Sequence, residues 1–135
     1  MKQSHILLLV LLIVTLTMNF PLSAHHGNVA YDTSKTVVLK GATVTKFLWI
    51  NPHTVVMFDV TDDKGNVVHW AGEAGSPSAL GLLGWQKTSV QPGDVITVYI
   101  YQAKTGNPVG RLNKIVLADG KELKDSALGY REVEQ

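Results

Sequence analysis

The sequence contains no cysteine among its 135 residues. Disulfides and thiolate metal ligands are therefore excluded, and any metal site must use histidine, carboxylate, amine or methionine donors. The chain also lacks a nucleophile motif, a phosphate-binding loop and a pair of carboxylates in a helical setting. Because such groups carry much of enzyme chemistry, the sequence favours a binding or accessory role over catalysis.

An excess of positive charge is missing as well. The 12 basic and 11 acidic residues give a formal net charge of +1, and their numbers become equal when Lys2 is left out. Proteins that bind nucleic acid usually carry a basic stripe, because counterion release supplies most of their affinity. We therefore expect no nucleic-acid partner.

Long hydrophobic runs are limited to a single one, from Ile6 to Met18. It follows a basic N-terminus and leads to a small residue at Ala24, an order that is typical of a secretory signal. The run is shorter than the ~20 apolar residues that span a bilayer. We predict that residues 1–24 are a signal peptide and that the mature chain begins at His25. The mature protein is then periplasmic or secreted, with no stable membrane anchor after cleavage.

A strong hairpin signal is present between Trp49 and Gly75. An Asp-Asp-Lys-Gly-Asn turn at residues 62–66 separates two runs rich in valine and aromatic residues, as in a type I turn closed by a glycine bulge. With Gly65 as the bulge, Phe58 lies opposite Trp70 on an apolar face, because side chains alternate along a strand. This register predicts a hairpin with one face for a core and a second, polar face.

The second face of the hairpin carries two histidines and two carboxylates. Asp59 lies opposite His69, while His53 is a diagonal neighbour of Glu73. Diagonal neighbours are ~7 to 8 Å apart between Cα atoms, so His53 and Glu73 can meet around an ion or through a hydrogen bond. His69 is ~20 Å farther along the strands and cannot join them. We expect it to pair with Asp59 instead.

The remaining chain predicts a single domain from residue 25 to residue 135. Outside the hairpin it has an extended lead-in at residues 27–35, a short helix at 76–84 and a polar C-terminal tail that frays. Three further strands are predicted at residues 36–49, 95–101 and 111–117. Gly41 marks a bend in the first of these strands. Five strands, a bent first strand and a helix between the third and fourth make up the plan of an OB-like barrel. The alternative is a small open β-sandwich.

Several short motifs together resemble an uncharacterised family of small exported bacterial proteins, which is a domain of unknown function. The motifs are Ala24-His25-His26, Tyr31-Asp32, Asn51-Pro52-His53, Trp70 with Glu73, Ser76-Pro77, Gly84-Trp85 and Pro92-Gly93-Asp94. The resemblance covers nearly all of the mature chain. It implies export, the fold and the motif positions, and it implies no activity.

The sharpest candidate for chemistry is His25. As the first residue of a mature chain it offers an α-amine and a ring nitrogen to one metal ion, and His53 would add a third nitrogen, a set that suits Cu(II). Zn(II) is the other candidate, and for either ion His26 and Glu73 are expected to help His25 and His53. Paired histidines at a chain start are also compatible with a merely polar terminus, and the proline before His53 with a purely structural loop.

A second hypothesis needs no metal. The exposed face of the second and third strands would bind a small ligand or a periplasmic protein. Trp49, Tyr99 and Tyr101 would form a stacking surface for a sugar or peptide, and Asn51 is a further candidate for ligand binding. Aromatic residues on small barrels also serve as cover for the core. A third hypothesis, an oxidase built on the N-terminal histidine, has no substrate platform in the sequence.

Overall fold

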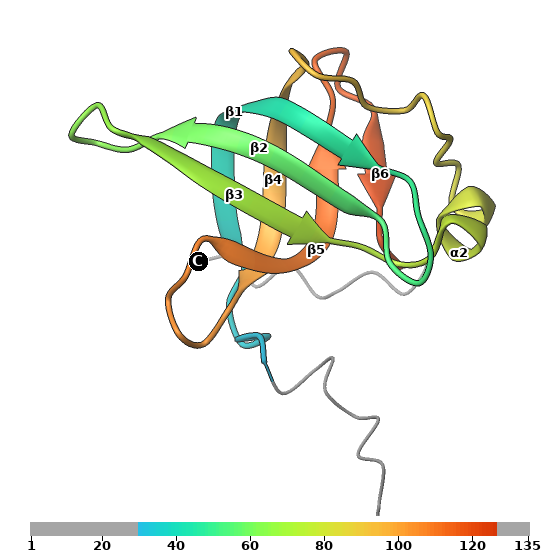
Figure 1. Ribbon diagram of the computed structural model, residues 1–135, viewed down its shortest axis with the longest axis horizontal. Coiled ribbons are helices and arrows are strands. Elements are labelled where there is room, and N and C mark those ends of the chain that lie inside the picture. Colours follow the sequence, from blue (N-terminus) through green and yellow to red (C-terminus); the bar gives the residue numbers. More distant parts are fainter. Residues whose placement is uncertain (1–29, 127–135) are drawn as a thin grey trace, which may run out of the picture.

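The computed structural model describes residues 30–126, in which strands follow one another with one short helix among them (Figure 1). The elements are β1 (Val37–Leu48), β2 (Val55–Thr61), β3 (Val67–Glu73), α2 (Pro77–Leu82), β4 (Val95–Gln102), β5 (Val109–Val116) and β6 (Glu122–Lys124). The helix begins as the sequence predicts. Ser76 is its N-cap and Pro77 lies in its first turn, where the missing N–H costs nothing.

The strands form a closed barrel. Their order is β3-β2-β1-β4-β5-β6, and β3 also pairs with β5 in parallel, which closes a ring of five strands and leaves β6 as an extra strand. This order, with α2 between β3 and β4, confirms the OB-like barrel and rules out the open sandwich. The fully buried Leu80 of α2 plugs one end of the core.

The predicted hairpin is confirmed pair by pair. Phe58 lies opposite Trp70 with their rings stacked at a centroid distance of 6.3 Å, and Asp59 lies opposite His69. The turn is held by Asp62, whose carboxylate accepts backbone hydrogen bonds, and by Gly65 at a φ of 84°. In Figure 1 this hairpin projects beyond the barrel. Trp70 therefore packs against the core but remains partly exposed.

The bend predicted at Gly41 is also present. Gly41 has a φ of 67°, and the register of β1 against β4 shifts between Leu39 and Ala42. The first half of β1 pairs with β4 and the second half with β2. One long strand thus serves both sides of the barrel.

The prediction of a polar tail that frays after the turn at residues 119–120 is wrong for its first part. Residues 122–124 form β6 against β5, where Leu123 is buried opposite Ile115. Trp85 holds the strand in place, because its Nε1–H donates to the Lys124 carbonyl oxygen at 2.9 Å. A strand with one buried apolar side chain between two charged ones carries too little periodicity to be recognised in the sequence.

No helix within residues 30–126 is long and apolar enough to cross a membrane. The predicted signal peptide, residues 1–24, lies outside the described residues.

Candidate functional site

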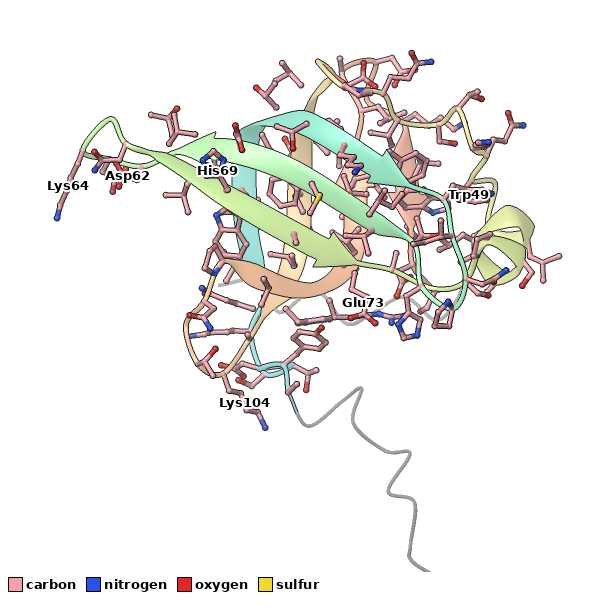
Figure 2. The ribbon with its side chains drawn as sticks, in the orientation of Figure 1. Trp49, Asp62, Lys64, His69, Glu73 and Lys104 are labelled. Carbon is pink, nitrogen blue, oxygen red and sulfur yellow. The ribbon has the colours of Figure 1, made fainter. Side chains whose placement is uncertain are left out.

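Polar side chains from five separate parts of the chain meet at the end of β3. We call them the Glu73 cluster: Tyr31, His53, Glu73, Arg111 and Asp125. They come from the lead-in, the β1–β2 loop, the last position of β3, β5 and the residue after β6. Figure 2 shows Glu73 beneath the end of β3 and His69 farther along the hairpin. The cluster and the Asp59–His69 pair are therefore separate places on the barrel.

The central contact joins His53 Nδ1 to Glu73 Oε1. A carboxylate at this nitrogen favours the tautomer that carries its proton on Nδ1 and donates it to Glu73. The Nε2 lone pair is then available to a metal ion. The His53 side chain is 49% exposed. The structure thus brings together two residues that the sequence predicts to be neighbours.

Tyr31 holds the other oxygen of the same carboxylate. Its hydroxyl donates to Glu73 Oε2 at 2.9 Å. Burial is the main cause that raises the pKa of the Tyr31 phenol above its ordinary value, followed by the hydrogen bond to Glu73 and the charge of Glu73. The phenol therefore stays protonated, and a hydrogen-bond donor, throughout the neutral range.

Arg111 connects the cluster to the last strand. Its Nε and one terminal nitrogen donate to Asp125 Oδ2 at 2.9 and 2.7 Å, while its other terminal nitrogen lies 3.9 Å from Glu73 Oε1. The second oxygen of Asp125 accepts from the Gly75 N–H at 2.6 Å. Burial raises the pKa of Asp125, although Arg111 and the Gly75 N–H act in the opposite direction.

The loop that carries His53 is fixed at both ends. Trp49 lies 5.7 Å from Phe47 between ring centroids and packs against the core. On the other side, the Thr54 N–H donates to the Gly75 carbonyl at 3.0 Å, and the Ala74 N–H donates to the Thr54 carbonyl at 2.8 Å. These contacts hold the backbone on both sides of His53. The peptide bond between Asn51 and Pro52 is cis.

Thr54 itself yields a stability prediction. It is fully buried, and its hydroxyl oxygen has no hydrogen-bond partner among the described residues. Thr54→Val keeps the shape and the backbone bonds and removes the desolvated hydroxyl, so the free energy of unfolding should stay unchanged or rise by about 1 kcal/mol. Urea denaturation measures this. The reverse change at a buried neighbour, Val56→Thr, should lower the free energy of unfolding by about 1 to 3 kcal/mol. A clear loss in Thr54→Val would mean that the hydroxyl has a partner.

The residues predicted as a ligand surface are not brought together. Tyr101 is only 5% exposed and its hydroxyl accepts from Asn113 Nδ2 at 3.1 Å, so it offers no stacking face. Tyr99 pairs with Val38 in the first half of β1, whereas Trp49 follows the end of that strand. Asn51 is exposed in the loop before His53. The expectation of one shared aromatic surface is corrected by this placement.

The residues predicted to bind a metal differ in whether and where the structure places them. His25 and His26 lie outside the described residues. Within residues 30–126, no group of three or more histidines and carboxylates is arranged to hold a metal ion. Both carboxylate oxygens of Glu73 are engaged, Oε1 by His53 and Oε2 by Tyr31. His69 pairs with Asp59 at 2.6 Å, as expected.

Sequence reasoning missed Tyr31, Arg111 and Asp125 as members of the cluster. Tyr31 precedes the first strand, and Asp125 follows a strand that was not predicted. The alternation of β5 could have placed Arg111 on the outer face, because the buried Leu112 lies beside it. Its partners, however, come from distant parts of the chain.

An open hollow of about 450 Å³ lies farther along the outer face of the hairpin. It is mainly apolar and is lined by Thr45, Met57, Asp59, His69, Trp70, Ala71, Pro108 and Val109. OB folds commonly bind ligands on this face, next to the loop between the fourth and fifth strands.

Comparison with known proteins identifies a family that matches the chain but no known activity. Residues 13–113 match a family of unknown function, DUF6152. No curated protein and no solved structure matches the chain.

Proposed function

Because the chain belongs to DUF6152, a family of unknown function, we propose a function from the site itself. The protein is an exported metal-binding protein that holds Cu(II), or Zn(II), through His53 and the mature N-terminal residue His25. His26 assists as a neighbouring imidazole, and Glu73 assists by orienting His53.

The observation that carries the proposal is the contact between His53 Nδ1 and Glu73. Histidines that bind metals in proteins usually donate their second ring N–H to a carboxylate or a carbonyl, which fixes the tautomer and raises the basicity of the ligating nitrogen. His53 has this arrangement, and its side chain is 49% exposed. A carboxylate partner and a half-exposed ring are the features expected of a ligating histidine, and they support this role for His53.

A second observation concerns the distance from the mature N-terminus. Tyr31 is bonded to the cluster through Glu73 and lies six positions after His25. Six residues span at most ~20 Å when extended. The α-amine and ring of His25 are thus close enough along the chain to join His53 Nε2. Amine and imidazole donors suit Cu(II), which binds such sites more tightly than Zn(II) does.

The test is a competition titration against a chelator of known affinity. Four forms are compared: the mature chain starting at His25, the same chain with one residue added before His25, and the mature chain with His53→Ala or with His69→Ala. The extension and His53→Ala should each weaken Cu(II) binding by at least about tenfold, or ~1.4 kcal/mol. His69→Ala is the matched control, because His69 also pairs with a carboxylate, and it should have almost no effect.

Binding should also depend steeply on pH. Imidazole and amine nitrogens bind metals only when deprotonated, so the affinity should fall as the pH is lowered from about 8 to about 6, the range in which free α-amino and imidazole groups take up protons. Equal Cu(II) affinity in the mature and extended forms would contradict the proposal.

The hollow on β2 and β3 supports a second candidate function, a metal-free module that binds a small ligand or a periplasmic protein. Its volume of about 450 Å³ lies within the usual range of small-molecule sites. Ala71→Gln would fill the hollow and leave His53 in place. If the second function holds, this variant should lose a partner captured by the purified protein, while His53→Ala should retain it.

A further inference from the structure

We propose that Tyr31 is a positioning residue of the metal site. Its hydroxyl fixes the Glu73 carboxylate, and the carboxylate in turn fixes the His53 ring. This inference rests on the proposed function and adds a residue that binds no metal itself. Its chemistry is a chain of two hydrogen bonds that ends at the ligating ring.

The two bonds use different oxygens of one carboxylate. The Tyr31 hydroxyl donates to Oε2 at 2.9 Å, and His53 Nδ1 contacts Oε1. A carboxylate held at both oxygens has its plane fixed, and the ring that donates to it is fixed as well. The Tyr31 hydroxyl therefore determines the direction of His53 Nε2 through Glu73.

Glu73 needs the hydrogen bond from Tyr31 because Arg111 offers its carboxylate a competing partner. One of its terminal nitrogens lies 3.9 Å from Glu73 Oε1, the oxygen that His53 contacts. Because Asp125 holds the other two guanidinium nitrogens, a charge-assisted hydrogen bond from this one would be a strong alternative for the carboxylate. Without the Tyr31 hydroxyl, Glu73 is free to turn toward Arg111, and His53 then loses the partner that selects its tautomer.

The hydroxyl of Tyr31 can be removed without releasing the lead-in. Tyr31 forms a β-bridge with Ala103, the Asp32 N–H donates to the Gln102 carbonyl at 2.8 Å, and the Lys104 N–H donates to the Ala30 carbonyl at 3.0 Å. These backbone contacts tie the lead-in to the β4–β5 loop. Tyr31→Phe therefore removes only the bond to Glu73, and the position of the lead-in stays the same.

The first test needs no metal. Ring ¹⁵N NMR of His53 should show the tautomer protonated at Nδ1 in the unmodified protein and a mixture of tautomers in Tyr31→Phe. Tyr99→Phe is the matched control, because Tyr99 packs against Lys114 on β5 with a distance of 4.6 Å from the ammonium to the ring centroid. This variant should leave the His53 signals unchanged. An unchanged tautomer in Tyr31→Phe would overturn the inference.

The second test measures Cu(II) affinity in a double-mutant cycle on the mature chain. Mutation of the direct partner of a metal-binding histidine typically costs 10- to 100-fold, and Tyr31 acts one hydrogen bond farther away, so Tyr31→Phe should weaken binding by about tenfold, at the lower end of this range. In a His53→Ala background, Tyr31→Phe should cause no further loss. A general loss of stability would lower the affinity in both backgrounds, and a thermal melt of each variant would reveal it.

The possible failures are distinguishable. If the mature chain binds Cu(II) well, needs His53, and binds equally well with Tyr31→Phe, the role of Tyr31 is overturned while the proposed function stands. If the mature chain binds Cu(II) no better than His53→Ala does, the proposed function is overturned and the role of Tyr31 with it.

Discussion

Gly110→Ala should destabilise the barrel by about 3 kcal/mol or more, at or beyond the upper end of the usual cost of overpacking. Gly110 lies in β5 opposite Gly72 of β3, at the parallel pairing that closes the barrel. A Cβ atom at Gly110 would overlap the backbone carbonyl oxygen of Tyr101 and crowd the fully buried Ile100. Because a backbone oxygen cannot move aside as a side chain does, β4 and β5 would have to separate.

Two other glycines provide graded controls in the same urea denaturation series. A Cβ atom at Gly72 would lie 2.6 Å from the Leu112 side chain, which can shift in part, so Gly72→Ala should cost about 1 to 3 kcal/mol. Gly81 lies in α2 with open space around it, and Gly81→Ala should be neutral or stabilise by about 0.5 to 1 kcal/mol. Equal stability of the Gly110 and Gly81 variants would contradict the close approach of strands at the seam.

Arg111→Met should lower the free energy of unfolding by about 2 to 4 kcal/mol at neutral pH. The side chain of Asp125 is only 2% exposed, and its charge would lose its main partner. Breaking a fully buried ion pair typically costs 3 to 5 kcal/mol, and the estimate here is lower because Arg111 is 30% exposed. Asp125→Asn in the same chain should restore part of the loss, since the amide carries no charge.

The stability lost in Arg111→Met should be smaller at acid pH than at neutral pH. Burial raises the folded-state pKa of Asp125 above its unfolded value, so the contribution of this group to stability is greatest below the unfolded pKa and declines as the pH rises through the folded one. Arg111 opposes that rise in pKa, and its removal enlarges the decline. The deficit of Arg111→Met should therefore be smaller at pH ~4 than at pH ~7. The same deficit at both pH values would show that lost packing, and not the charge of Asp125, is the cause.

The features that the sequence predicts well are local. The turn at residues 62–66 fixes the register of the hairpin, so the pairs Phe58–Trp70 and Asp59–His69 follow from strand alternation alone. The contact between His53 and Glu73 follows from the same register. The bend at Gly41 and the cap at Ser76 are likewise signals within a few residues.

The features that it does not predict depend on distant segments. Tyr31 reaches Glu73 across 42 positions, and Asp125 reaches Gly75 across 50. Neither side chain carries a local signal for its partner. Tyr101 alternates with the fully buried Ile100 and should therefore face outward, but it is buried too, just after the point where the register of β4 against β5 shifts.

The barrel also explains why the candidate site lies where it does. OB folds commonly bind their ligands with the β1–β2 loop, the β4–β5 loop and the face of the second and third strands. His53 lies in the first of these loops, and the lead-in that carries Tyr31 is bonded to the second. The closed seam between β3 and β5 holds these parts at a fixed separation. A metal site here would use the customary binding edge of the fold.

Pulsed EPR of Cu(II) bound to the mature chain tests the metal site most directly. The chain carries ¹⁵N in its histidine rings, and the spectra of the unmodified protein, His53→Ala and His69→Ala are compared. The proposed site predicts strong hyperfine coupling to directly bound histidine nitrogens, with the contribution of one ring missing in His53→Ala and an unchanged spectrum in His69→Ala. A spectrum that is the same in His53→Ala as in the unmodified protein would contradict a metal site at His53.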